Sequence, residues 1–569
     1  MKRCGKEWSR KWRKTEIAAA QTTAAAGAAE AVTTEAAASA ATTATAAAAA
    51  RQTEYTTRVK LRANITTSEP LTDNAMYEWF SDKFQVDMEY IPMLFGERHE
   101  KARIWAASGD VPDILWMDLN ENLYTEWVSW IEGGLFKPFP KDLGGREAIS
   151  ATFDQMIGDE MLTVDGELYA LPCMQDSASY DFQVSQGFAY RADWAEQLGL
   201  RKEGDIYTWE EFVDLMRAFI EKDPGGNGAG KTYGMSAPQW YFPDCFGIWQ
   251  LQHPVWGTEE PSFLAQDGKY VWAPSQDNFI EGLVTAKKLF EDGVIWQDNV
   301  VDTNSTMYYD LYIAGQMGAL VDNLTASNLK TRRDAMLKAN PSLDREKCYA
   351  IAKVASPGKP DEFWQKESPC YWSATSMSAS VSEDQMNRYL DIFNWILTDE
   401  GKYFKLYGLE GIDYTAAADG TVNLLWQKND QGLYIDPYPN GSRSFYTRMK
   451  LSGAEDAFTN VALPEMDRRD AKDGMDFYFT KGTVRHLDYN LFYTSTPNKD
   501  RYGLFIEEVK AKLIEVMSTT NADNVEQVWR DWIATMIPKV QPVLDDLNQL
   551  PCIPATRQEM MDYVSATRQ

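Results

Sequence analysis

The alternation of strand-like and helix-like segments in residues 58–117 constrains the fold of this chain more than any other feature. Three segments have the apolar patterns of strands, at 58–65, 86–91 and 114–117. Two segments between them have helical spacing, at 72–84 and 97–108. The first helix follows Thr72 and Asp73, which are good N-caps. Strand–helix–strand repeats predict right-handed crossovers and a largely parallel α/β sheet.

Trp116 and Asp118 stand at the carboxyl end of the third predicted strand, where open α/β sheets bind their ligands. A Trp ring there can stack on a pyranose, and Asp118 with the nearby Asn120 can hydrogen-bond its hydroxyls. The opposing interpretation is that Trp116 is a core residue of the sheet. The sequence leaves both interpretations open. With 20 Trp and 28 Tyr, the chain has many side chains of the kind that suits sugars.

The chain is too long for a single hydrophobic core. At 569 residues, it should divide into two or more lobes. Its clearest helix is at 208–221, where Thr208 and Glu211 form a capping box ahead of an apolar face. Further amphipathic helices are predicted at 277–292, 385–398 and 502–518.

The composition of the N-terminal region predicts a flexible tether. Of the 33 residues from 18 to 50, 20 are Ala, and most of the others are Thr. Such a segment has no apolar face to bury, so residues 1–53 are predicted to be a basic N-terminus followed by a disordered linker.

Cys4 has two interpretations. It lies in a basic stretch that lacks the apolar region of a signal peptide. One interpretation is a cytoplasmic protein with a basic tail. The other is that Cys4, followed by Gly5, is the lipid-accepting cysteine of a bacterial lipoprotein whose signal peptide is truncated or wrongly bounded. The low-complexity spacer that follows supports a surface-tethered, extracellular lipoprotein, and the N-terminus by itself leaves both interpretations open.

Charge and composition disfavour several classes of function. A net charge of −28 disfavours nucleic acid and anionic membrane surfaces as partners. The six cysteines contain no CxxC pair, and the three histidines have no metal-ligand spacing. Metal hydrolysis and Ser-His chemistry therefore have little support. The sequence contains no run of about 18 apolar residues, so it predicts no transmembrane helix.

Several short motifs resemble those of a known family, in the same order. Residues 164–172 (VDGELYALP) resemble the DGKxYxLP hairpin of extracellular solute-binding proteins of ABC sugar importers. Later segments are similar to further family motifs, at 190–200 (YRADWAEQLGL), 208–212 (TWEEF), 223–234, 315–320 (GQMGAL) and 397–401 (LTDEG). The strongest resemblance is to the large oligosaccharide-binding lipoproteins of Gram-positive bacteria. It spans about 58–411, and no motif is matched in 412–569.

This resemblance implies a two-lobed, periplasmic-binding-protein-like (type II) α/β fold with the ligand in a cleft between discontinuous lobes. Chain crossings are expected near 171–181, 345–350 and 408–412. The N-lobe would comprise 54–175 and 349–408, and the C-lobe 178–345 and 412–569.

The residues expected to line the cleft stand near predicted strand ends or crossings. They are Trp116, Asp118, Gln175, Trp240, Asp322, Asn323 and Trp372.

The segment from Asp223 to Gly234 partly resembles a calcium-binding loop. Asp223 and Asn227 occupy positions 1 and 5, but position 3 is Gly225 and the later carboxylates are missing. Two side-chain oxygens are few for a cation that takes six to eight. We therefore expect a metal-free glycine turn and no cofactor, with calcium as the disfavoured alternative.

The resemblance implies a monomeric binding protein, not an enzyme. It would capture an oligosaccharide by hinge closure and deliver it to the transmembrane subunits of an ABC permease. Two alternatives stay open. A polysaccharide-active hydrolase needs a pair of carboxylates, which 84 acidic residues could supply. A cell-surface adhesion module would use the tether but would not close on small ligands.

Overall fold

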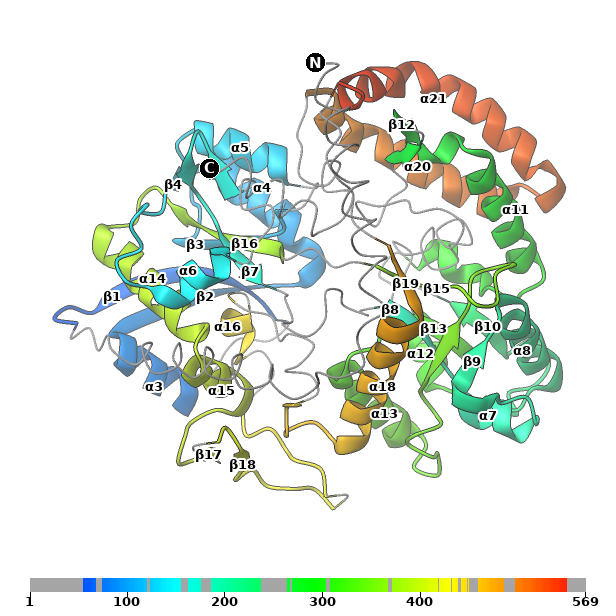
Figure 1. Ribbon diagram of the computed structural model, residues 1–569, viewed down its shortest axis with the longest axis horizontal. Helices are drawn as coiled ribbons and strands as arrows, with labels where there is room; N and C mark the ends of the chain where they lie inside the picture. Colours follow the sequence, from blue (N-terminus) through cyan, green and yellow to red (C-terminus); the bar gives the residue numbers. More distant parts are fainter. Residues whose placement is uncertain are drawn as a thin grey trace, which may run out of the picture. The chain divides into compact units, whose positions relative to one another are not determined.

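The computed structural model contains two α/β sheets, each with its own helices (Figure 1). It describes residues 55–67, 74–119, 123–154, 162–174, 186–236, 263–266, 269–302, 307–366, 371–417, 419–430, 432–438, 442–447, 449, 459–485 and 497–549. Seven of the residues discussed above lie outside these ranges: Cys4, Gly5, Thr72, Asp73, Asn120, Gln175 and Trp240. The predicted tether at 1–53 also lies outside them.

The first sheet has the strand order β2-β1-β3-β16-β4, and β7 also pairs with β16. Its strands are β1 (Val59–Thr66), β2 (Val86–Met93), β3 (Ile114–Met117), β4 (Phe136–Lys137), β7 (Leu171–Met174) and β16 (Tyr371–Ser378). β1 is parallel to β2 and to β3, whereas β16 is antiparallel to β3. The three predicted strands of the N-terminal region are therefore confirmed.

Several helices accompany the first sheet, and three of them match the segments predicted at 72–84, 97–108 and 385–398. They are α3 (Ala75–Phe84), α4 (Arg98–Ser108), α5 (Tyr124–Glu132), α6 (Glu147–Asp154), α14 (Glu383–Ile396) and α15 (Asp399–Tyr407). The predicted cap of α3 was wrong. Asn74 is the N-cap, and its side chain accepts a hydrogen bond from the Tyr77 N–H. Thr72 and Asp73 precede that position and lie outside the described residues.

The second sheet has the strand order β10-β13-β8-β14-β9. Its strands are β8 (Gln186–Tyr190), β9 (Ile206–Tyr207), β10 (Tyr233–Ser236), β13 (Met317–Asn323) and β14 (Ala350–Val354). β13 is parallel to β10, and β8 runs antiparallel to both β13 and β14. A mixed sheet is thus built around a single reversed strand.

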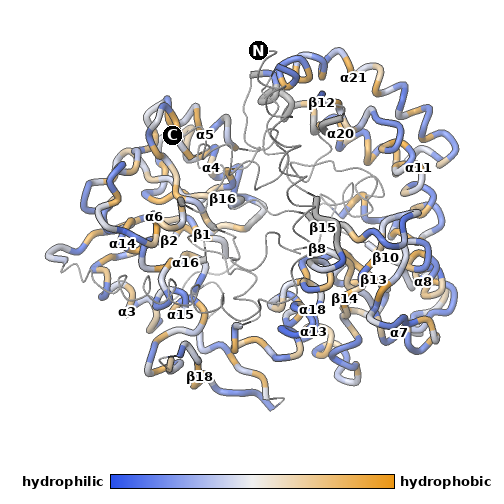
Figure 2. The backbone as a smooth tube through the Cα atoms, viewed as in Figure 1, coloured by the Kyte–Doolittle hydropathy of each residue, from blue (hydrophilic) through white to orange (hydrophobic). Residues whose placement is uncertain are grey.

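Helices cover both faces of the second sheet. Adjacent residues of β13 point to opposite faces, and both faces carry apolar, buried residues. Ala319 and Val321 belong to the core with α8 (Trp209–Lys222) and α11 (Asp277–Glu291). Leu320 belongs to the core with α12 (Met307–Ile313) and α13 (Ala326–Ala339). The predicted capping box of α8 is present, with Thr208 and Glu211 bonded reciprocally. Figure 2 shows hydrophobic and hydrophilic residues alternating along α8.

The C-terminal part contributes long helices. α20 (Pro497–Thr519) and α21 (Val525–Leu547) pack on each other, and α21 also contacts α11. α18 (Glu465–Lys481) packs on α13 and β14. The remaining strands form pairs, namely β5 (Thr163–Val164) with β6 (Glu167–Leu168), β11 (Phe263–Gln266) with β12 (Lys269–Trp272), β15 (Phe363–Lys366) with β19 (Gly482–Arg485) and β17 (Tyr414–Ala416) with β18 (Val422–Leu424). Among the described helices, none is both long and apolar enough to cross a membrane.

Two of the predicted chain crossings were wrong. Residues 350–354 pair with β8 in the second sheet, so the chain leaves this sheet after Val354 and not at 345–350. α16 (Ser444–Thr447) packs against β1, and the Ser444 hydroxyl donates to the Thr66 carbonyl. The chain therefore leaves the first sheet's surroundings after α16 and not at 408–412. The first crossing lies between Met174 and Gln186, outside the described residues.

The first of these errors has a physical cause. An apolar strand such as β14 carries no sequence signal for the sheet it joins, because either sheet would bury it. The lobe boundaries at 349 and 412 were inferred from the family pattern, and the contacts of β14 and α16 move both.

Candidate functional site

The chain leaves the first sheet after β7 and enters the second at β8, and it leaves the second sheet after β14 and returns to the first at β16. All four of these strand ends lie at the edges where the parallel strands end. In the first sheet, Met174 at the end of β7 pairs with Tyr371 at the start of β16. Met117 at the end of β3 pairs with Ala374, near the same edge. In the second sheet, Asn323 at the end of β13 pairs with Gln186 at the start of β8. These two carboxyl edges are where α/β sheets bind ligands, so they are the candidate site.

The edge of the first sheet carries a buried carboxylate, Asp118, one residue beyond β3. Its Oδ2 accepts from Arg98 Nε at 2.7 Å and lies 2.9 Å from His99 Nε2. Only 1% of the residue is exposed. Its Oδ1 is buried and has no hydrogen-bond partner in the described part of the chain. A buried acceptor without a protein partner is a natural position for a water or a ligand hydroxyl.

Trp116 lies one step inside this edge. Its indole N–H donates to the Ser373 hydroxyl at 2.9 Å, and 2% of the residue is exposed. The Asn64 side chain brackets the Trp116 backbone, donating to its carbonyl at 2.9 Å and accepting from its N–H at 2.8 Å. In this conformation the ring is covered, so stacking on a ligand stays a prediction. Trp372 lies in β16, and its side chain is outside the described residues.

The edge of the second sheet is built around Asp322, the penultimate residue of β13. Asp322 is 4% exposed. Five donors reach its carboxylate, and they are the Tyr309 and Tyr349 hydroxyls, Arg332 Nε, Asn328 Nδ2 and the Asn323 backbone N–H. With both oxygens occupied, Asp322 acts through the groups it holds. Asn323 beside it is exposed.

Two residues of this edge were missed by sequence reasoning, Arg332 on α13 and Tyr309 on α12. The Arg332 guanidinium carbon lies 3.6 Å from the Tyr309 ring centroid. Burial, with the charge of Asp322, raises the pKa of the Tyr309 hydroxyl. No motif in the sequence marks either residue, because their proximity arises from the packing of two helices on β13.

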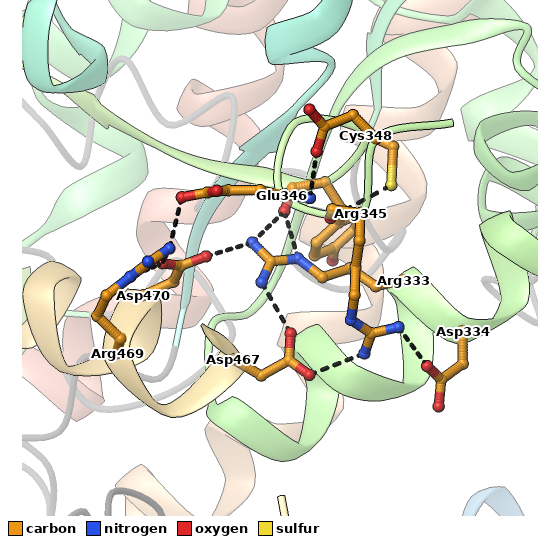
Figure 3. A network of polar contacts seen from close by, with 10 residues as sticks. Arg333, Asp334, Arg345, Glu346, Cys348, Asp467, Arg469 and Asp470 are labelled. Carbon is orange, nitrogen blue, oxygen red and sulfur yellow. Dashed lines mark hydrogen bonds and ion pairs between the residues drawn. The ribbon is translucent and has the colours of Figure 1, made fainter. Parts of the chain in front are cut away.

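A buried ion-pair network anchors the neighbouring part of α13 to α18 (Figure 3). Arg333 donates to Asp467 and Asp470 at 2.7 Å each, and to the Tyr349 carbonyl at 2.9 and 3.1 Å. Arg345 donates to the other oxygen of Asp467 at 2.8 Å. Arg333 and Asp467 are both fully buried. The Tyr349 hydroxyl also donates to Asp322, so this network helps to fix the position of Asp322 at the carboxyl edge of the second sheet.

The segment that resembles a calcium loop is closed by its own hydrogen bonds. Asp223 accepts from the backbone N–H groups of Asn227 and Gly228 and from the Thr232 hydroxyl. These bonds, that of Thr232 foremost, lower the pKa of Asp223. A Cβ on Gly225 would lie 2.8 Å from both the Gly315 carbonyl oxygen and the Trp194 ring. Position 3 therefore has no room for a carboxylate. Among the described residues, no group of three or more His, Cys, Asp or Glu could hold a metal.

Comparisons with known proteins agree with this geometry. Lipoprotein LipO of Bacillus subtilis is 22% identical over 380 residues, which cover 66% of this chain and 71% of LipO. The alginate-binding protein AlgQ2, solved without calcium ion, has a TM-score of 0.59 at 15% identity, over 87% of this chain and 98% of its own. FusA, an ABC-transporter substrate-binding protein of Streptococcus pneumoniae solved with kestose, has a TM-score of 0.58 at 14% identity, over 89% and 100%.

These likenesses show the fold, a two-lobed periplasmic-binding-protein-like α/β architecture, and confirm the fold expected from the motifs. The model of the family described as bacterial extracellular solute-binding protein matches residues 68–434, more than half of the chain. The chain belongs to the bacterial extracellular solute-binding proteins.

Proposed function

We propose that this chain is the substrate-binding component of an ABC transporter, which captures an oligosaccharide and delivers it to the transmembrane permease subunits. The observation that carries the proposal is the shared position of the two polar clusters. Asp118 and Asp322 each lie at the carboxyl edge of a sheet, where the connecting chain enters or leaves. Family membership and the similarity to FusA support the same function.

Capture follows from the two-lobed design. A sugar that contacts both edges binds the closed state more tightly than the open one, so it shifts the population toward closure. For a micromolar dissociation constant the binding free energy is about −8 kcal/mol. A few charged or amide hydrogen bonds and one or two aromatic contacts suffice for that value.

We propose that the seven residues inferred from the sequence form the site, with roles refined by their surroundings. Asp118 offers a buried acceptor oxygen, and Asn323 offers an exposed amide. Trp116 and Asp322 hold neighbouring groups in place. Gln175, Trp240 and Trp372 are proposed contacts because they stand near predicted strand ends or crossings.

Binding without turnover is the proposed activity, in preference to hydrolysis. Membership of a solute-binding family supports this choice, and so does the similarity to a transporter's binding protein. We propose that the protein acts as a monomer and has no cofactor or nucleic-acid partner. Extracellular tethering through Cys4 and the Ala/Thr-rich segment is supported by the similarity to the lipoprotein LipO.

A thermal-shift screen against neutral and acidic oligosaccharides tests the function. A ligand that binds only the folded state raises the melting temperature. At a ligand concentration of 100 times the dissociation constant, the added free energy of unfolding is about 2.7 kcal/mol. We expect at least one oligosaccharide to do so. If peptides or other solutes shift the melting temperature and no sugar does, the proposed function is wrong.

A further inference from the structure

Arg332 uses only one of its three guanidinium nitrogens in hydrogen bonds to described residues, so the other two can contact a ligand. It lies on α13 and donates through Nε to Asp322 Oδ2 at 2.9 Å. In the described part of the chain, its guanidinium also packs on the Tyr309 ring, and no hydrogen bond from its terminal nitrogens, Nη1 and Nη2, is present. The side chain is 24% exposed, so the end of the guanidinium is accessible.

The surroundings of Arg332 hold this donor pair in place. The Tyr309 ring supports one face of the guanidinium at 3.6 Å, and the Tyr309 hydroxyl is itself fixed on Asp322 at 2.7 Å. The next residue, Arg333, is locked into the buried network with Asp467. A guanidinium fixed in this way loses little conformational freedom on binding, which is the condition for a specific contact.

The chemistry of an end-on guanidinium selects a planar anion. Nη1 and Nη2 present parallel N–H groups whose spacing matches the two oxygens of a carboxylate. A neutral sugar hydroxyl gains less, because it accepts from only one of these donors and carries no negative charge, so the second, parallel hydrogen bond and the ion pair are both missing. Asp322 does not compete for them, since it is engaged through Nε and saturated by its other donors.

We propose that Arg332 is a ligand-contacting residue that recognises a carboxylate, so that the captured oligosaccharide contains uronic acid. This inference rests on the proposed function, because it concerns the same edge of the second sheet. It adds the chemical class of the sugar and a residue that determines specificity.

The experiment compares oligosaccharides that differ only in their carboxylates. Galacturonate and alginate hexamers are titrated into the full chain by calorimetry, each beside its carboxyl-reduced, neutral counterpart, in buffer containing EDTA. The variants are Arg332→Gln and Arg332→Lys. The control is Arg217→Gln, an exposed residue of α8 whose replacement changes the net charge by the same amount.

We expect one acidic hexamer to bind more tightly than its reduced form. Arg332→Gln should lower that affinity about 10- to 150-fold, the range for losing hydrogen bonds to a charged group. The affinity for the neutral form should hardly change, and Arg332→Lys should recover only part of the loss. Arg217→Gln should behave as the unmodified chain.

The inference is wrong if acidic and reduced hexamers bind equally, or if Arg332→Gln weakens the binding of both equally. It is also wrong if an Arg332→Gln chain with an unchanged melting temperature loses no affinity. If neutral sugars bind and acidic ones do not, the uronic-acid inference falls while the proposed function stands. If no carbohydrate in the thermal-shift panel binds, the proposed function falls as well.

Discussion

Replacement of Trp116 should act first on stability. The ring is 2% exposed and its N–H is bonded to Ser373. Trp116→Ala removes a large buried side chain, so we expect the free energy of unfolding to fall by about 3–5 kcal/mol. Urea denaturation measures this loss. Trp116→Phe keeps most of the buried area and should cost less.

The alternative role of Trp116 is tested on the same proteins. If the ring contacts the sugar, Trp116→Phe should raise the dissociation constant while the urea midpoint stays near that of the unmodified chain. A stable Trp116→Ala protein with an affinity loss of about 5- to 150-fold would show that Trp116 acts at the binding site and is not a core residue.

Asp223 gives a pH-dependent prediction. Donors from Thr232 and Gly228 lower its pKa in the folded protein. A carboxyl with a lowered folded pKa stabilises the fold above its unfolded pKa of about 3.9, and this contribution disappears as the pH falls through the folded value. The melting temperature of Asp223→Asn should therefore lie below that of the unmodified chain at pH 7. The difference should shrink below about pH 4.

The same measurement separates a metal-free turn from a calcium site. We propose that the loop from Asp223 to Gly234 needs no metal, because its own donors occupy the Asp223 carboxylate. The difference between the two proteins should then be equal in EDTA and in calcium. A fall of several degrees in EDTA, restored by calcium and absent in Asp223→Asn, would show a bound ion.

At the scale of elements, the attachment of α18 depends on Asp467. This carboxylate is fully buried and accepts from Arg333 and Arg345. Asp467→Ala leaves two largely buried guanidinium groups without this partner. We expect a loss of about 3–5 kcal/mol in the free energy of unfolding, as for other broken buried pairs.

Asp473→Ala is the matched control, because it removes the same charge from an exposed position of α18. Its urea midpoint should stay close to that of the unmodified chain. If Asp467→Ala has an equally small effect, α18 is not held by this network. A hydrogen-exchange measurement on α18 should show faster exchange in Asp467→Ala alone.

Local signals explain which elements could be predicted from the sequence. The capping box at Thr208 predicted α8, and the alternation in 58–65 predicted β1, because both signals act within one segment. The sheet that β14 joins and the contact of α16 with β1 depend on partners far along the chain. Arg332 was missed for the same reason, since its environment is assembled from α12, α13 and β13.

For the whole molecule, the family and its two-lobed fold were predicted from the order of several short motifs. Individually weak segments between about 58 and 411 identified the family, and the family model matches residues 68–434. The position of Asp118 and Asp322 at two carboxyl edges follows from that topology. The polar groups around each carboxylate could not be inferred, because side-chain contacts between distant segments leave no periodic pattern.

Recovery of the ligand after binding separates capture from hydrolysis most directly. The purified chain is saturated with the oligosaccharide that raises its melting temperature most, freed of excess sugar by gel filtration, denatured, and its bound sugar analysed by mass spectrometry. For a binding protein we expect about one intact oligosaccharide per chain, even after prolonged incubation. Shorter fragments that accumulate with time would show hydrolysis, and the absence of any retained carbohydrate would show that the chain does not capture a sugar.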